Sequence, residues 1–342
     1  QVDNEACFFF RTAAYDQDYH PDAIARFGDY LAARYGTQLP AAYGGVPASA
    51  VDPPRSMNAR GAEELVPHLD WLAFKEQLLV DVLARMARVL REAGQVRLPL
   101  LHNLPATEEG EPFSVSRAEG QLDLVGLDLH PPRRDYGATR RAAQLLAGSS
   151  RLPWLAELGW GGWPWWLPQT PADQLNTALA ALMHGVKGFN LYMGVERDRW
   201  YGAPISAQGR PQRDQYELTR QLVAAVRQTQ LGRLQRPVEV ALMQPRDYRR
   251  LARCCSLLDP LPPMGLSLLG LGAVECASEE TFGLEGPVQI EQAQIAGAIE
   301  QQLTQLRVPY HLVDSDAAVD RLQRYRLLLV PTFDFIDREL LG

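Results

Sequence analysis

The chain has 342 residues, 46% of them hydrophobic, and a net charge of −7, which is the composition of an ordinary globular protein. A single core would be unusually large at this length, so we expect two domains. The acidic balance argues against a nucleic-acid partner, which needs a basic face. No apolar run approaches the roughly 20 residues that span a bilayer, so no membrane partner is expected. The four cysteines show neither a CxxC pair nor zinc-ligand spacing, and we expect reduced thiols with no metal or cofactor.

The first residues, Gln1–Glu5 (QVDNE), read as the end of a strand. A basic region followed by an apolar stretch is absent, so no signal peptide is visible and a cytoplasmic location is expected. Because the chain starts inside a motif and not on Met, we also expect its natural start to lie upstream.

Strand-like runs alternate with amphipathic helices over the first 228 residues. The expected strands are Gln1–Glu5, Arg97–Asn103, Leu122–Pro131, Leu152–Glu157 and Val186–Met193. Between them, apolar residues recur at helical spacing in three sets: Leu79, Leu83, Met86 and Leu90; Leu175, Leu179 and Leu182; Leu218, Leu222 and Val226. This alternation predicts a parallel sheet, either doubly wound or closed into a (β/α)8 barrel.

Polar residues at the C-terminal ends of these strands favour the barrel, because barrel enzymes place their chemistry on that rim. They are Asn4 and Glu5, His102 and Asn103, Asp128 and His130, Glu157, and Asn190 and Tyr192. Five strands make only part of an eight-stranded barrel. We therefore expect strands four to eight here and strands one to three upstream.

A second α/β unit is expected after a linker over Thr229–Pro237. Its expected strands are Val238–Met243 and Tyr325–Pro331, with a helix face at Ile295, Ile299, Leu303 and Leu306. The predicted domains are thus 1–233 and 234–342, the second with a small parallel sheet. The segment Leu261–Gly272 lacks the strand–GxGxxG–helix order of a dinucleotide site and is expected to be a loop.

One carboxylate, Glu157, lies within Pro153–Trp166, a stretch that holds five of the seven tryptophans of the chain. Indole faces pack against the C–H faces of sugars, and apolar walls disturb the ionisation of a carboxylate. Core packing or a partner interface explains such a stretch equally well. A second carboxylate, Glu5, follows Asn4 at the end of an earlier strand. Glycoside hydrolysis needs two carboxyl groups across the scissile bond, and an Asn beside the acid can bind the sugar 2-OH.

Four segments resemble glycoside hydrolase family 35, the β-galactosidases of the large retaining (β/α)8 clan. Gln1–Glu5 resembles the acid/base motif Q-[VI]-E-N-E, and Glu157–Trp160 resembles the nucleophile segment. Asn190–Met193 resembles the last-strand N-L-Y-M, and Tyr201–Ser206 resembles Y-D-A-P-[IL]-S. The helix at Asp22–Tyr35 and the second α/β unit are more similar to family 42. That likeness implies a flavodoxin-like, trimerisation-type domain over 234–342, cut short at Gly342, and a homo-oligomer formed through it.

The resemblance implies a role for each matching residue. Glu5 is the general acid/base, with a raised pKa, and Glu157 is the nucleophile, roughly 5–5.5 Å away. Asn4 and Tyr192 orient the sugar and the nucleophile, and Trp160 and Trp200 are the expected stacking platforms.

Departures from family 35 lie on the rim. Ala6-Cys7 replaces Tyr-Gly, His130-Pro131 replaces Tyr-Pro, and the charged tract Glu196–Arg199 replaces a Gly- and Asn-rich one. His130 is expected either to bond Glu157 or to be structural, and Asn103 either to contact substrate or not. Asp128 is interpreted as a sugar ligand or an internal anchor.

The predicted function is a retaining hydrolase of terminal β-galactosides that binds a carbohydrate substrate. The alternatives are the same chemistry on a β-glucoside, xyloside or arabinoside, and a carbohydrate-binding pseudoenzyme.

Overall fold

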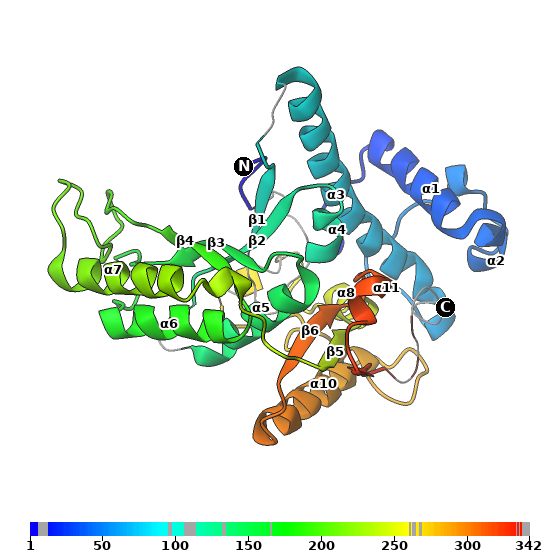
Figure 1. Ribbon diagram of the computed structural model, residues 1–342. Coiled ribbons are helices and arrows are strands. Elements are labelled where there is room, and N and C mark those ends of the chain that lie inside the picture. Colours follow the sequence, from blue (N-terminus) through cyan, green and yellow to red (C-terminus); the bar gives the residue numbers. More distant parts are fainter. Residues whose placement is uncertain are drawn as a thin grey trace.

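The computed structural model contains two parallel β-sheets, of four and three strands, with helices packed around them. Figure 1 shows the two sheets side by side, with α3 running past both. The structure describes residues 1–5, 13–94, 98–105, 114–131, 135–164, 166–259, 261, 265–266, 269–332, 334 and 336. Expectations about Cys7, Arg97, Trp165 and residues 262–264 and 267–268 of the expected loop lie outside the described residues.

The four-stranded sheet has the order β1-β2-β3-β4, every neighbouring pair being parallel. Its strands are β1 (Leu101–Pro105), β2 (Leu124–Leu129), β3 (Trp154–Gly159) and β4 (Gly188–Tyr192). Gln1–Glu5 was expected as a further strand. It forms an isolated parallel bridge, Asn4 with Asn103, and Val2 N donates to Leu101 O at 2.9 Å. The segment therefore lies beside β1, where the barrel order puts it.

Helices follow the strands of this sheet as the alternation predicts. They are α3 (Val66–Gly94) before β1, α4 (Val115–Glu119), α5 (Tyr136–Ser149), α6 (Pro171–Met183) and α7 (Arg213–Gln228). α6 begins with a capping box between Thr170 and Asp173 and has Pro171 in its first turn, features that fix a helix start. The expected helix faces are partly wrong: Leu83 and Leu222 are buried, but Met86, Leu90 and Leu179 are exposed. Figure 1 shows the C-terminal end of α3 extending beyond the sheet.

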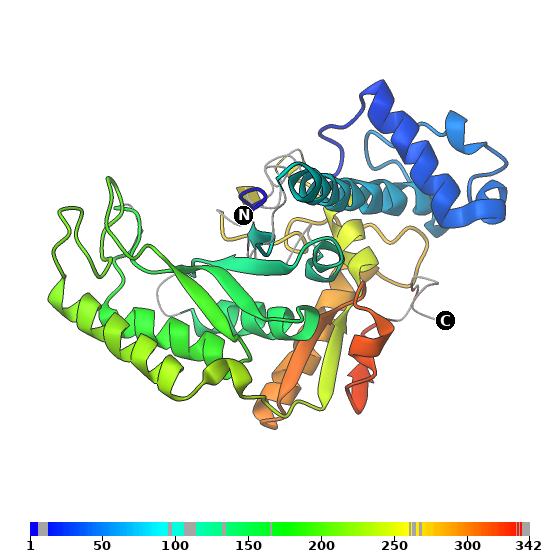
Figure 2. The same ribbon diagram turned by 45° about the horizontal axis from the view of Figure 1, so that its top comes forward.

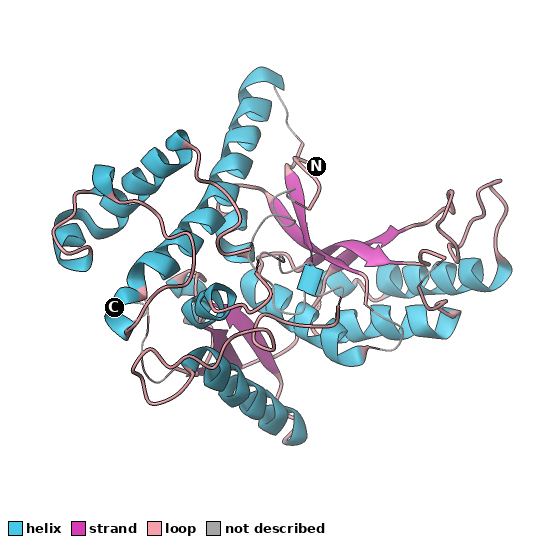
Figure 3. Ribbon diagram, turned by 180° about the vertical axis from the view of Figure 1, so that it is seen from behind, coloured by secondary structure: helices cyan, strands magenta, loops and turns pink. Residues whose placement is uncertain are grey.

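The helical elements between Pro21 and Glu64 form a small layer against α3, on the side away from the strands (Figure 3). It consists of α1 (Pro21–Tyr35), α2 (Leu39–Ala42) and 3-10 turns at Gly36–Gln38, Ala48–Ala50 and Ala62–Glu64. Phe27 packs edge-on to Trp71 of α3, with ring centroids 5.2 Å apart. Asp70 accepts hydrogen bonds from the hydroxyls of Tyr35 and Tyr43 at 2.8 and 2.7 Å.

The three-stranded sheet has the order β6-β5-β7, again all parallel. Its elements are β5 (Val240–Gln244), α8 (Arg246–Cys254), α10 (Val288–Gln305), β6 (Tyr310–Asp314), α11 (Val319–Leu322) and β7 (Leu327–Leu329), after a 3-10 turn at Leu231–Arg233. Figure 2 shows α10 alongside this sheet. The small parallel sheet is thus as predicted. Cys254, Cys255 and Cys276 are buried thiols, as expected.

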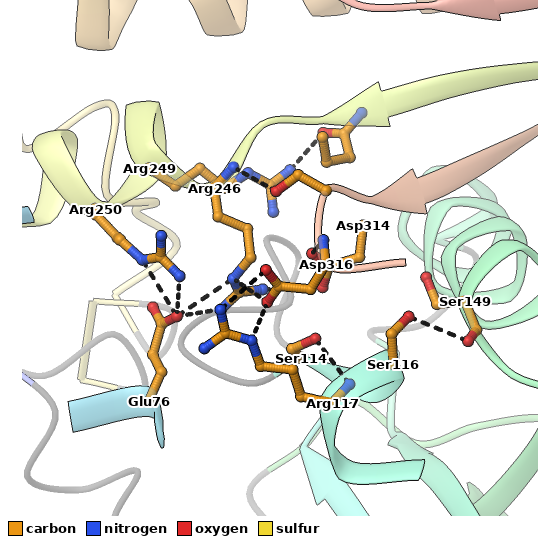
Figure 4. Close-up of polar contacts among 12 residues, drawn as sticks. Glu76, Ser114, Ser116, Arg117, Ser149, Arg246, Arg249, Arg250, Asp314 and Asp316 are labelled. Atoms are coloured by element: carbon orange, nitrogen blue, oxygen red, sulfur yellow. Dashed lines mark hydrogen bonds and ion pairs between the residues drawn. The ribbon is translucent and has the colours of Figure 1, made fainter. Parts of the chain in front are cut away.

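A buried ion network joins α3 to the second sheet (Figure 4). Glu76 of α3 is 5% exposed and accepts from Arg250 Nη2 at 2.7 Å, from Arg246 and from Arg253. Arg246 Nη1 also donates to Asp314 Oδ2 at 3.0 Å. Burial alone would raise the pKa of Glu76, but the arginines hold it well below its usual value of 4.5.

Candidate active site

The sheet register brings the rim residues of successive strands next to one another. Asn4 pairs with Asn103, Pro105 pairs with Asp128, and Asp128 pairs with Glu157. A register shift between Leu127 and Asp128 sets the Asp128–Glu157 pairing. Because all these strands are parallel, their C-terminal side chains gather at one edge. The residues that the sequence singled out on separate strands therefore share one site.

Asn103 lies at the centre of the hydrogen bonds in this site and is 1% exposed. Its Nδ2 donates to Asp128 Oδ2 at 2.6 Å and to Asn4 Oδ1 at 3.1 Å, and lies 3.5 Å from Glu157 Oε1. Its Oδ1 accepts from Gln1 Nε2 and, at 3.4 Å, from the backbone N–H of Glu5. One amide thus links the segment that carries Glu5 to the strand that carries Glu157. The neighbouring His102 is fully buried, with Nδ1 3.1 Å from Asp3 O.

Glu157 has a second hydrogen-bonding partner, His130, which follows the end of β2. His130 Nε2 lies 3.2 Å from Glu157 Oε2, and each side chain is about one-fifth exposed. The His130 ring packs edge-on to Tyr192, with centroids 5.4 Å apart. His130 was expected either to bond Glu157 or to be structural, and the structure shows the bond.

Glu5 has a pKa raised above its usual value of 4.5. Burial is the largest cause, and the negative charge of Glu157 adds to it. Asn4 Nδ2 lies 3.5 Å from Glu5 Oε2. Glu5 also has a φ of 51°, a left-handed backbone conformation that costs a non-glycine residue on the order of 1 kcal/mol. A strained backbone conformation persists where surrounding contacts fix it. At Glu5 one such contact is the hydrogen bond from its backbone N–H to Asn103 Oδ1.

A third carboxyl, that of Asp128, also lies in this site. The sequence suggested either a sugar ligand or an internal anchor for it. It is 3% exposed, and its pKa is raised to about 9 by burial first and then by the charges of Glu157 and Glu5. Its position at the end of β2 was visible in the sequence. Its depth was not, because that depends on how β1 and β3 flank β2.

The expected stacking platforms, Trp160 and Trp200, do not occupy stacking positions in this structure. Trp160 is 0% exposed and donates from Nε1 to Thr219 Oγ1 at 2.9 Å; Trp200 is 1% exposed and donates to Trp160 O at 3.1 Å. An indole with no exposed surface offers no face to a sugar, so these two rings form a wall behind the site. Tyr192 packs edge-on to Trp200 at 5.0 Å. Trp166, 39% exposed and 6.3 Å from the His130 ring, is the better placed indole.

The charged tract after β4 is partly engaged in the site. Arg197 Nη2 donates to the hydroxyl of Tyr192 at 2.6 Å. Glu196 Oε1 accepts from the backbone N–H of Gly202 at 2.9 Å. Arg197 therefore fixes the Tyr192 hydroxyl, and Glu196 closes its own loop.

Within the described part of the chain, no group of three or more His, Cys, Asp or Glu side chains is arranged to hold a metal ion. A separate cavity of about 500 Å³ lies at the carboxyl ends of the second sheet, beside Arg246 and Asp316. Its arginines are bound to the carboxylates of the ion network. The described helices include none that is both long and apolar enough to cross a membrane.

Known proteins share this fold without close sequence similarity. No family model matches the chain, and no curated protein matches its sequence. The β-galactosidase of the Antarctic haloarchaeon Halorubrum lacusprofundi superposes with a TM-score of 0.61 at 18% identity, over 94% of this chain and 48% of that one. The β-galactosidase of Bacillus circulans sp. alkalophilus gives 0.65 at 16% identity, over 91% and 45%. A catalytic mutant of a GH42 β-galactosidase from G. stearothermophilus gives 0.66 at 14% identity, over 92% and 46%.

These similarities establish the fold: the chain has the α/β architecture of β-galactosidases of the barrel class, and it spans about half the length of the matched structures. The resemblance to family 35 in particular is not supported: of the three structures described above, the one whose family is stated belongs to GH42. A flavodoxin-like second domain is likewise not confirmed.

Proposed function

We propose that this chain carries the acid/base and the nucleophile of a retaining glycosidase that cleaves terminal β-galactosides. The observation that carries the proposal is the interaction of two rim glutamates, Glu5 of the N-terminal segment and Glu157 of β3. The charge of Glu157 raises the pKa of Glu5, and Asn103 contacts both residues. A carboxyl whose pKa is raised by a second carboxyl nearby is the arrangement that this chemistry requires of its acid/base.

The proposed reaction has two steps. In the first, a Glu157 oxygen attacks the anomeric carbon, the bond from that carbon to the leaving oxygen breaks, and Glu5 gives its proton to the leaving oxygen. In the second, water attacks the anomeric carbon, the bond to Glu157 breaks, and Glu5 accepts the proton from the water. Forming the ester removes the charge of Glu157, which lowers the pKa of Glu5 and suits it to act as a base.

The surrounding residues orient these two groups. His130 and Asn103 bond opposite oxygens of Glu157, which fixes the carboxylate for attack. Asn4, whose Nδ2 lies 3.5 Å from Glu5 Oε2, supplies the amide that binds the sugar 2-OH in this proposal. Tyr192, held by Arg197, closes the side of the site next to His130. The choice of galactose is supported by the activity named for the matched structures, which are β-galactosidases.

The test is hydrolysis of a panel of nitrophenyl β-glycosides by the full-length protein. We expect the highest kcat/KM on the galactoside, and Glu157→Gln to lower kcat by at least about 10³-fold. Glu217→Gln, an exposed glutamate of α7, is the matched control and should keep full activity. A preference for the glucoside, xyloside or arabinoside would overturn the specificity. Sugar binding without hydrolysis of any glycoside would indicate the pseudoenzyme.

Retention of configuration has its own test. Azide should restore turnover to Glu157→Gly and give the α-glycosyl azide, because azide then attacks from the face that the carboxylate has vacated. An inverted first product from the unchanged protein would exclude the double displacement.

A further inference from the structure

Asp128 is the one carboxyl of the site that has no role in the reaction as proposed. It is flanked in the sheet by Pro105 on β1 and Glu157 on β3. One oxygen, Oδ2, accepts from Asn103 Nδ2 at 2.6 Å. The other, Oδ1, is buried and receives no donor from the described residues. The carboxyl of Glu5 lies within hydrogen-bonding reach.

Ionising all three carboxyls of this partly buried site at once would carry a large free-energy cost. Like charges at this range oppose one another, and a buried ionised oxygen without a donor is costly. Two carboxyl oxygens can bond to each other only when one of them holds a proton. Neutral donors are few here: the Asn103 amide serves Asp128, and His130 serves Glu157.

We propose that Asp128 is a positioning residue that keeps its proton throughout the reaction and donates a hydrogen bond to Glu5. The inference rests on the proposed function, since it assigns the protons of the same site. At rest, the three carboxyls hold two protons, on Asp128 and Glu5, and one negative charge, on Glu157.

This arrangement affects the step in which Glu5 transfers its proton to the leaving oxygen. The leaving oxygen takes the proton, the Glu157 charge is consumed in the ester, and the single negative charge now lies on Glu5. The Asp128 O–H faces that new carboxylate and stabilises it. The contact thus strengthens as the reaction proceeds, which is the condition for a contact to accelerate a step.

The ionisation of Asp128 agrees with this role. The titratable groups that act on it are Glu5 from the N-terminal segment and Glu157 from β3; His130, just after β2, bonds Glu157, and β1 contributes the neutral Asn103. Burial and the two glutamates raise its pKa to about 9. The group is therefore protonated at neutral pH and loses its proton only as the pH rises through that value.

Two substitutions of Asp128 test whether its side chain is protonated or ionised. Asp128→Asn keeps an acceptor for Asn103 and supplies an N–H where the acid supplies its O–H. We expect it to keep kcat/KM within about tenfold and to leave the alkaline limb of the pH profile unmoved. Asp128→Ala should lower kcat/KM about 10- to 100-fold, mostly through kcat.

The opposite results would overturn the proposal. If Asp128 is ionised, Asp128→Asn removes a negative charge beside Glu5, and the alkaline limb moves to lower pH by about one unit or more. An Asn variant that is as impaired as the Ala variant, or an Ala variant as active as the unchanged protein, would also contradict it.

A measurement without substrate keeps the test independent of the proposed function. In full-length protein labelled with carbon-13 aspartate, we expect an infrared band from a protonated aspartic acid at pH 7. The band should disappear as the pH rises through about 9 and be missing from Asp128→Asn. Absence of the band from the unchanged protein would overturn the proposal. A protein that shows the band but hydrolyses no glycoside would refute the function and leave the proton assigned.

Discussion

At the scale of single residues, Asn103 holds the two proposed catalytic glutamates in one frame. Asn103→Ala removes the contact to Glu157, the bond to the Glu5 backbone and the donor to Asp128 at once. We expect kcat to fall about 10- to 100-fold with a smaller change in KM, because orientation and not binding is lost. We also expect about 1–3 kcal/mol lower stability, because Asp128 loses a buried donor. Steady-state kinetics and urea unfolding measure the two effects.

Asn176→Ala is a suitable control, since this exposed asparagine lies on α6, away from the proposed site. An equal loss of kcat in both variants would mean that the effect of Asn103→Ala is not specific to the site.

The link between the two glutamates is itself measurable. Glu5 has a raised pKa, so it is protonated above the range of an ordinary glutamate and loses its proton, and with it acid catalysis, as the pH rises. Glu157→Gln removes the second largest cause of that shift, and we expect the pKa of Glu5 to fall. Carbon-13 NMR titration of the glutamate carboxyls, assigned with Glu5→Gln, measures it. Glu217→Gln should leave the titration of Glu5 unchanged, and a Glu5 that ignores Glu157→Gln would show that the two do not interact.

At the scale of elements, α8 is attached to α3 by charge. Glu76→Gln would leave Arg246, Arg250 and Arg253 without their shared carboxylate in a buried setting. We expect a loss of about 3–5 kcal/mol in unfolding free energy. Urea unfolding measures it. Glu239→Gln, which breaks an exposed ion pair with Arg326, is the matched control and should cost about 0–1 kcal/mol.

The pH dependence of this loss has a defined sign. The folded-state pKa of Glu76 lies below its usual value of 4.5. Its contribution is therefore complete above about pH 4.5 and decreases as the pH falls below it. The difference in stability between Glu76→Gln and the unchanged protein should narrow in that acid range. A constant difference across it would show that the charge of Glu76 is not the cause.

Local patterns predicted the elements better than their contacts. Strand order, the rim positions of Glu5 and Glu157 and the start of α1 follow from residue type and spacing, which act over a few residues. The burial of Trp160 depends on Thr219 of α7, 59 residues away, and the depth of Asp128 depends on two flanking strands. The docking of α8 on Glu76 joins residues 170 to 177 apart. No periodicity records such pairings, so the burial of Trp160, the depth of Asp128 and the ion network were not predicted, although the rim position of Asp128 was.

At the scale of the whole molecule, α5 is shared between the two sheets. One of its faces contributes Ala143 and Leu146 to the core of the first sheet. The other lies against β6 (Figure 1), where Gln144 Nε2 donates to Tyr310 O at 3.1 Å. Gly148 permits this approach, because a Cβ there would overlap the carbonyl of Leu312.

Gly148→Ala therefore tests the contact between the sheets. Although alanine favours a helix, we expect a net loss of about 1–3 kcal/mol, because the added methyl meets backbone that cannot move aside. Thermal unfolding measures it. Gly137→Ala, in the first turn of the same helix with only a side chain nearby, is the control and should be neutral or slightly stabilising. Equal behaviour of the two variants would show that the β6 contact is loose.

The shared helix has a practical consequence for anyone dividing this chain. A cut at the sequence boundary between residues 233 and 234 separates the expected domains, yet it strips β6 from α5. α5 connects β2 to β3, the strands that carry Asp128 and Glu157. A fragment ending at residue 233 would thus expose the face of α5 that packs against β6 in the whole chain. Expression trials should keep the second sheet attached.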